Sequence, residues 1–178
     1  KLNSNITMDH SVLSNNYANV DGGGIFVQEN SNVAYINASI VINNTAHLGN
    51  GGAIYGSATS ILNTNFTDNS AMYNGGALYT NLLISNALTI KNTEFHKNSA
   101  HQSSGGGIHI YKTYSNPTTV YLDECQITSN TAYNDGGFMY SNESAIRFFV
   151  LNSKLKENTA SNGDGGCIFG RSNVTMDI

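Results

Sequence analysis

One short phrase built around a glycine pair occurs six times in this chain, and the repetition constrains the fold more than any other feature. The pairs begin at Gly22, Gly51, Gly75, Gly105, Gly136 and Gly165, so successive copies are 29, 24, 30, 31 and 29 residues apart. Self-similarity at a period of roughly 20–50 residues is typical of repeat architectures. The chain is therefore expected to be a stack of similar units.

Each copy also contains the phrase Asn-x-Ala or a close equivalent, six or seven residues before the glycine pair. Its asparagines are Asn16, Asn44, Asn69, Asn98, Asn130 and Asn158. A large apolar residue stands three residues before each asparagine, a small residue two further back, and another apolar column precedes these. Such alternation with a period of two, interrupted by Gly, Asn and Ser, indicates short strands. Each unit is predicted to hold three strands and three turns.

A unit of this length cannot bury its apolar side alone, but stacked copies can. We therefore expect an all-β fold, a right-handed single-stranded parallel β-helix of about six coils of 24–31 residues. Equivalent residues would lie about 4.8 Å apart along the axis, and the hand follows from the chirality of parallel crossovers. The repeat is shorter than a propeller blade and lacks the leucine-rich pattern.

The repeat covers residues 1–178 as one array. The phrases "NITMDH" from Asn5 and "NVTMDI" from Asn173 occupy the same phase of the repeat. Solenoids need atypical polar caps to stop further strand pairing, and neither phrase resembles one. The array is expected to be a segment of a longer solenoid, or a unit that stacks end to end.

The repeated asparagine is expected to turn inward at a corner of each coil. Stacked asparagines at the spacing of adjacent strands can pass amide hydrogen bonds along the axis, which predicts an asparagine ladder. The alanine two residues later would be small because the corner is tight. The glycines would supply a positive φ or allow close approach between coils.

Composition excludes several classes of function. Charged residues are 11% of the chain and the net charge is −4, with only 8 Lys and Arg, so no nucleic-acid partner is expected. The longest apolar run, residues 146–151, contains Arg147 and is too short to span a bilayer. The two cysteines, Cys125 and Cys167, are too few for a disulfide scaffold or a four-ligand zinc site. We favour free buried thiols over a disulfide between the two, and we expect no metal and no cofactor.

The repeat resembles a known family. "GGAI" from Gly51 and "GGAL" from Gly75 combine with the pattern F-x-x-N at Phe66 and Phe95, and this combination resembles the chlamydial polymorphic outer membrane protein repeat. The resemblance extends over essentially the whole chain, although Leu13, Val41, Ile127 and Leu155 replace the phenylalanine. It implies a right-handed β-helix passenger at a cell surface, associated with adhesion or a structural coat. It implies no catalytic residues.

Six asparagines begin the sequence N-x-S/T, which is a glycosylation acceptor in secreted proteins. They are Asn5, Asn37, Asn43, Asn65, Asn142 and Asn173. Each is expected to point outward or to lie in a loop after the glycine strand. They are candidate glycosylation sites if the source secretes glycoproteins.

An aromatic column follows the glycine pairs. It consists of Phe26, Tyr55, Tyr79, His109, Tyr140 and Phe169. The neighbouring column is uniformly aliphatic and should face inward, so the aromatic side chains should face outward. They could bind a sugar face or another filament, or they could simply stack on one another beneath a loop.

Two aspartates give the best case for an enzyme. Asp135 and Asp164 precede glycine pairs in consecutive coils, at a separation of about 5 Å that would suit a calcium pair or retaining glycosidase carboxylates. Asp-Gly is also a common turn dipeptide, and no basic cluster lies nearby in sequence. We favour the turn interpretation, and the chain is not expected to be an enzyme.

These features lead to an expected function. The chain is interpreted as a secreted or cell-surface structural β-helix that associates with itself or a related β-helix, end to end or laterally, in a filament, appendage or wall. The alternative is an adhesin or glycan-binding passenger domain. A polysaccharide lyase or glycoside hydrolase is the third possibility.

Overall fold

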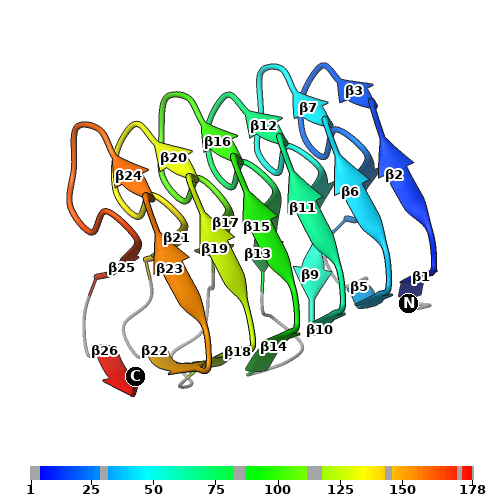
Figure 1. The fold of residues 1–178 in the computed structure, drawn as a ribbon. Helices are drawn as coiled ribbons and strands as arrows, with labels where there is room; N and C mark the ends of the chain where they lie inside the picture. Colours follow the sequence, from blue (N-terminus) through cyan, green and yellow to red (C-terminus); the bar gives the residue numbers. More distant parts are fainter. Residues whose placement is uncertain are drawn as a thin grey trace.

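The computed structural model describes residues 5–28, 32–81, 87–111, 118–142, 146–171 and 174–177, which form strands and turns without a helix. The chain winds as a parallel β-helix, as predicted (Figure 1). In this view the strands of the near face run upward while successive coils lie further to the left, which is a right-handed sense.

Four parallel sheets form the faces of the coil. The first face contains β1 (Asn5–Asp9), β5 (Asn32–Asn37), β10 (Ser60–Leu62), β14 (Ala87–Lys91), β18 (Thr118–Asp123), β22 (Ile146–Leu151) and β26 (Val174–Asp177), with β9 (Ser57–Ala58) also paired to β5. The second face contains β2 (Val12–Ser14), β6 (Ile40–Ile42), β11 (Asn65–Thr67), β15 (Glu94–His96), β19 (Gln126–Thr128) and β23 (Lys154–Lys156).

The other two faces lie around the glycine pairs. The third face contains β3 (Tyr17–Ala18), β7 (Thr45–Ala46), β12 (Ser70–Ala71), β16 (Ser99–Ala100), β20 (Thr131–Ala132) and β24 (Thr159–Ala160). The fourth face contains β4 (Ile25–Phe26), β8 (Ile54–Tyr55), β13 (Leu78–Asn81), β17 (Ile108–Tyr111), β21 (Met139–Ser141) and β25 (Ile168–Gly170). The second, third and fourth faces each hold six strands and therefore span five complete turns.

The predicted columns are in register. Phe66 pairs with Val41 on one side and with Phe95 on the other. The Phe66 and Phe95 rings are fully buried and stack with centroids 4.7 Å apart and an interplanar angle of 2°. Like side chains thus lie over like side chains, and one apolar core runs along the axis.

The coil has four strands per turn rather than the predicted three. The additional strand is the third-face pair of residues that follows each repeated asparagine, such as Ser70–Ala71 in β12. It is only two residues long, so it is too short to show an alternating pattern in the sequence. Its alanine is buried, as Ala71 shows. The predicted tight corner is therefore the start of a short strand.

The asparagine ladder is present and buried. The side-chain amide of Asn44 donates to Oδ1 of Asn69 at 3.0 Å, and that of Asn69 donates to Oδ1 of Asn98 at 3.0 Å. Each Oδ1 also accepts the backbone N–H of the preceding ladder asparagine, as in Asn44 N to Asn69 Oδ1 at 3.1 Å. The Asn69 amide additionally donates to the carbonyl of Val41 at 2.9 Å. One side chain therefore satisfies backbone and side-chain groups of two neighbouring coils.

A second ladder runs on the outside with the opposite polarity. At the corner between the first and second faces, Asn92 donates to Asn63 at 2.8 Å and Asn63 donates to Asn37 at 2.9 Å. These amides donate toward the N-terminal coils, whereas the buried ladder donates toward the C-terminal coils. Asn37 in turn donates to Asp9, whose carboxylate can only accept.

Two corners use left-handed residues that are not glycine, which the sequence analysis did not predict. The corner before the second face has Asn63 at φ 49° and Asn92 at φ 46°, and the corner before the third face has Asn43 at φ 54° and Lys97 at φ 52°. Asn tolerates this conformation better than most residues. Lysine has no comparable preference for this conformation, so the residue type at Lys97 does not indicate it. The surrounding coils impose the conformation there.

The glycine pair has two separate roles at the third corner, which joins the third and fourth faces. Gly51 has φ +65°, in the left-handed region. A Cβ at Gly52 would collide with the carbonyl groups of Gly76 and Ser70 in the next coil. The first glycine therefore provides the turn and the second allows the coils to approach, as predicted.

The buried ladder should be the most sensitive polar element of the fold. Asn69→Ala leaves the amides of Asn44 without their acceptor and the Val41 carbonyl without its donor. We expect the free energy of unfolding to fall by about 2–5 kcal/mol, because each buried group left unpaired costs about 1–3 kcal/mol. Urea denaturation measures the change. Asn65→Ala, on the exposed side of β11, is the matched control and should change stability by less than about 0.5 kcal/mol. Equal stability of the two variants would contradict this role.

Candidate functional surfaces

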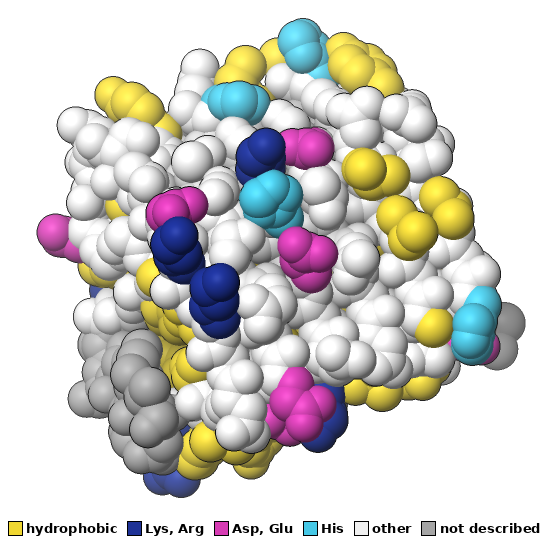
Figure 2. All heavy atoms as spheres, viewed as in Figure 1, with side chains coloured by type: hydrophobic (Ala, Val, Ile, Leu, Met, Phe, Trp, Pro, Cys, Tyr) yellow, Lys and Arg dark blue, Asp and Glu magenta, His cyan; other side chains and the backbone are white. Residues whose placement is uncertain are grey.

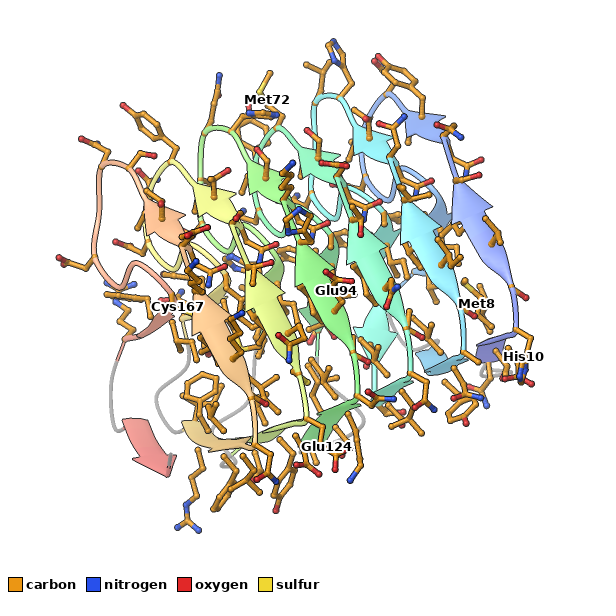
Figure 3. All side chains as sticks on the ribbon, in the orientation of Figure 1. Met8, His10, Met72, Glu94, Glu124 and Cys167 are labelled. Atoms are coloured by element: carbon orange, nitrogen blue, oxygen red, sulfur yellow. The ribbon has the colours of Figure 1, made fainter. Side chains whose placement is uncertain are left out.

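The outer surface of the second face changes character along the axis. Val12 and Ile40 are exposed neighbours in the first two coils, whereas Lys154 and Lys156 are exposed in the last. Figure 2 shows this face, with neutral atoms over most of it, hydrophobic side chains near the N-terminal coils and charged side chains nearer the C-terminal coils. Figure 3 shows Glu94 at the middle of the face and Glu124 at its lower corner. The face has no continuous row of a single charge.

The aromatic column forms one continuous stack on the outer side of the fourth face. Its five successive ring pairs have centroid separations of 5.0, 4.8, 5.1, 4.8 and 5.4 Å from Phe26 to Phe169. The rings cover one another's faces, so most of them offer only edges to a partner. Phe26, which is 54% exposed, is the most open ring of the stack. Mutual stacking is therefore the main role that the geometry supports for this column.

His109 lies inside this stack, between Tyr79 and Tyr140. The residue is only 7% exposed, and its Nδ1 atom has no hydrogen-bond partner among the described residues. Burial lowers the pKa of His109 to about 4, although a hydrogen bond to the backbone of Ser104 acts in the opposite direction. The imidazole is thus held neutral between two tyrosine rings.

Burial shifts the pKa values of the neighbouring tyrosines upward, because it disfavours the charged phenolate. It raises the pKa of Tyr79 above its usual value, and Tyr55 and Tyr111 nearby add to the effect. It also raises the pKa of Tyr140. Both phenols therefore stay neutral under physiological conditions, and the column is an uncharged strip.

The sequon asparagines have different surroundings. Asn37 and Asn43 donate their amides within outer hydrogen bonds, Asn37 to Asp9 at 2.8 Å and Asn43 to Asn15 at 2.7 Å. Asn142 accepts a hydrogen bond from Arg171, and Asn65 lies exposed on the second face. Asn5 is exposed in β1, and Asn173 lies outside the described residues. Glycosylation at these positions stays a prediction.

The acidic pair belongs to a turn. The Asp135 carboxylate accepts the backbone N–H of Asp164 at 2.8 Å. At the same corner of earlier coils, the Asn50 amide donates to Asp21 at 3.0 Å and the Asn74 amide donates to Asn50 at 2.9 Å. In these coils the residue before the glycine pair joins adjacent coils by hydrogen bonds, a role that the sequence argument did not predict.

Both cysteines are free thiols. Cys125 is buried in the column of small residues, and its thiol contacts the carbonyls of Asp123 and Ile90. Burial raises the pKa of Cys125, and it raises the pKa of Cys167 to about 12. Neither thiol is activated as a nucleophile, because the thiolate is the reactive form.

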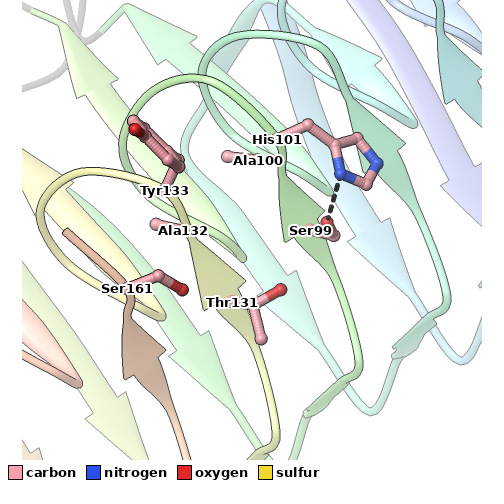
Figure 4. A pocket seen from close by; sticks show the side chains of 7 residues that line it. All are labelled: Ser99, Ala100, His101, Thr131, Ala132, Tyr133 and Ser161. Atoms are coloured by element: carbon pink, nitrogen blue, oxygen red, sulfur yellow. Dashed lines mark hydrogen bonds between the residues drawn. The ribbon is translucent and has the colours of Figure 1, made fainter.

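A shallow depression of about 120 Å³ lies beside the third corner, between neighbouring coils. Tyr133 stands on one side and His101 on the other, with Ala100 between them and with Thr131 and Ser161 below them in Figure 4. His101 is oriented by Ser70, whose Oγ lies 2.8 Å from Nε2. Nearby, Met72 projects outward from the same corner of an earlier coil (Figure 3).

The described residues contain no helix long and apolar enough to cross a membrane. They also contain no group of three or more His, Cys, Asp or Glu side chains that could hold a metal ion.

Comparison with protein families matches the first three units. The family described as the Chlamydia polymorphic membrane protein repeat matches residues 10–28, 38–57 and 63–81. The matched stretches thus resemble this repeat over the first three units of the chain. The later units carry the same glycine pair and Asn-x-Ala phrase, and their strands continue the same four sheets.

A curated relative supports this relationship. The probable autotransporter YfaL of Escherichia coli strain K12 is 27% identical over 199 aligned residues, which cover 93% of this chain and 16% of the relative. The chain thus spans about one sixth of that protein's length. No solved structure matches significantly. The chain is a β-helix repeat array related to Chlamydia polymorphic membrane proteins and to an autotransporter.

Sequence reasoning found the columns but missed the depression. His101 and Tyr133 occupy equivalent corner positions of consecutive coils, directly after the alanine of Asn-x-Ala. The residues there differ from coil to coil, so no repeat pattern marked them. Variation at a corner position of an otherwise regular repeat is the signal that could have identified them.

The buried imidazole makes a prediction about pH. The folded state disfavours protonation of His109, so its contribution to stability is complete above pH 6.5 and is lost as the pH falls toward 4. The free energy of unfolding should decrease by about 3 kcal/mol over this interval, since one pKa unit corresponds to about 1.4 kcal/mol. Urea denaturation between pH 4 and pH 8 tests this. His109→Phe should remove this decrease in the free energy of unfolding at low pH. Parallel plots of unfolding free energy against pH for the two proteins would refute the prediction.

Proposed function

We propose that the chain is a structural segment of a cell-surface protein, in which the β-helix serves as a rigid rod within a longer passenger region. The kinship with repeats of membrane proteins and an autotransporter suggests a cell-surface location. The observation that carries the structural role is the continuous ladder, which runs from the Asn16 amide donating to Asn44 at 2.8 Å to the Asn130 amide donating to Asn158 at 2.9 Å and is buried at its four central asparagines. Its hydrogen bonds join every coil to the next.

The outer surface fits the same role. Its polarity comes mainly from neutral amides and hydroxyls, and charged residues are only 11% of the chain. A rod of this kind resists unfolding locally because each coil is held by two neighbours, as in other solenoids.

Surface display tests the rod. The chain is placed between a signal peptide and the translocating unit of an E. coli autotransporter, and cells are treated with an external protease. We expect the wild-type rod to reach the surface and to resist cleavage, whereas Asn69→Ala should be cleaved faster because it opens the ladder. Cleavage of both proteins at the same rate would argue against a rigid rod.

We further propose that the rod associates laterally with a second β-helix through the outer side of its second face. Val12 is 67% exposed and Ile40 is 46% exposed, and the two are paired neighbours in β2 and β6. Exposed apolar side chains that lie together are typical of a contact surface. The partner is another copy of this chain or a related β-helix.

The lateral contact has a direct test. Val12→Lys places a charge among the exposed apolar side chains and should abolish association, whereas Gln126→Lys adds the same charge to an exposed position of the same face nearer the C-terminus and should preserve it. Sedimentation velocity over a concentration series, with negative-stain microscopy, measures the effect. Monomers at every concentration of the wild-type protein would exclude association.

Adhesion is the second candidate function. The observation that favours it is the set of exposed aromatic side chains at the third corner, where Tyr73 is 44% and Tyr133 is 49% exposed. Tyrosine presents a large apolar ring with a polar end, which suits binding surfaces. The stacked column itself offers fewer open ring faces.

A further inference from the structure

We propose that the depression between His101 and Tyr133 binds one ring of a neutral sugar. This site deepens the adhesion candidate and does not depend on the proposed role as a rod. Its chemistry rests on four features of the lining: its hydroxyl groups, its exposed aromatic ring, an oriented imidazole and the lack of charge.

Hydroxyl groups dominate the polar lining. Thr131 in β20, Ser99 in β16 and Ser161 after β24 contribute three side-chain hydroxyls, and Tyr133 adds a fourth. A hydroxyl can donate and accept at the same time. Groups of this kind best match a ligand whose own groups also do both. A polyhydroxylated ring meets that requirement.

Tyr133 supplies the apolar part of the site. Its side chain is 49% exposed, and it stacks on no other aromatic ring among the described residues. This distinguishes it from the fourth-face column, where neighbouring rings such as Tyr55 and Tyr79 stack at 4.8 Å. One side of a sugar ring carries C–H groups, and these can pack on an open aromatic face.

The imidazole of His101 is fixed but keeps one nitrogen available. Ser70 Oγ lies 2.8 Å from Nε2, which holds the ring in place. The Nδ1 atom has only a long contact of 3.4 Å with Ser99 Oγ (Figure 4). A ligand hydroxyl can replace or share this weak contact at little cost.

The size and charge of the depression restrict the ligand. None of the residues that line it is Asp, Glu, Lys or Arg, so nothing there would pair with an acidic or a basic sugar. Its volume of about 120 Å³ is well below the roughly 300–1,000 Å³ of sites that enclose drug-sized ligands. A second, larger hollow is lined by His101, Gln102 and Tyr133. The depression therefore seats a single ring of a glycan, and the remainder can lie along the neighbouring open surface.

Binding is measured by saturation-transfer NMR and calorimetry on the full chain. The probes are methyl glycosides of neutral hexoses and N-acetylhexosamines, with glucuronic acid and N-acetylneuraminic acid for comparison. For such a shallow site we expect dissociation constants on the order of 1–10 mM for at least one neutral sugar, which corresponds to about −3 to −4 kcal/mol. The acidic sugars should bind more weakly.

Variants locate the site. Tyr133→Ala should weaken binding at least about tenfold, Tyr133→Phe should retain most of it because the ring face remains, and His101→Ala should weaken it severalfold. Tyr73→Ala is the matched control, because it removes an exposed tyrosine from the same corner of an earlier coil, outside the depression. It should bind like the wild-type protein. Circular dichroism and urea midpoints confirm that each variant folds.

The possible outcomes distinguish failure of the proposed sugar site from failure of the proposed adhesion function. Absence of saturable binding to every neutral probe up to about 50 mM would overturn the site. Binding that persists unchanged in Tyr133→Ala would also overturn it, while leaving adhesion through another surface in place. An equal loss in Tyr73→Ala and Tyr133→Ala would show non-specific binding to tyrosines and would overturn it as well.

Discussion

The structure depends on the hydrogen bonds that run along the axis between equivalent groups of adjacent coils. The buried asparagine is central, because its Oδ1 accepts two hydrogen bonds from one neighbouring coil while its amide donates to both neighbours. Buried polar groups are costly unless they are paired, so this side chain can occupy the interior only while the coils stay in register. The alignment of the coils and the pairing of the buried asparagine side chains therefore depend on each other. The apolar columns, such as Phe66 above Phe95, follow from the same registry.

Much of this could be predicted from the sequence because the repeat places equivalent residues at equivalent positions. The inward columns, the asparagine ladder and the two roles of the glycines all followed from that argument. The two-residue strand of the third face could not be predicted, since Ser70–Ala71 is too short to alternate. The left-handed corner at Lys97 was hidden as well, because neighbouring coils rather than the residue itself impose it.

Among the candidate sites too, some could be predicted from the sequence and others could not. The aromatic column was identified from its repetition, and mutual stacking was one of its two predicted roles, but the sequence could not show that the stack buries His109. The depression at the third corner was missed, because it arises where consecutive coils differ. Repetition thus reveals the scaffold, whereas the surface features that distinguish one coil from another lie at positions where the repeat varies. Candidate binding sites on the surface of this solenoid therefore have to be identified in each coil separately.

The opposite polarity of the inner and outer ladders has a consequence for how such a chain changes in length. Along each ladder the amides donate in one direction: Asn69 donates to Asn98 of the following coil inside, and Asn92 donates to Asn63 of the preceding coil outside. A tandem duplication of one unit in the gene would therefore insert a coil whose hydrogen bonds match on both sides. A reversed unit would place donor against donor. Rods of many lengths can thus arise from one motif by gain and loss of whole units, always in the same orientation.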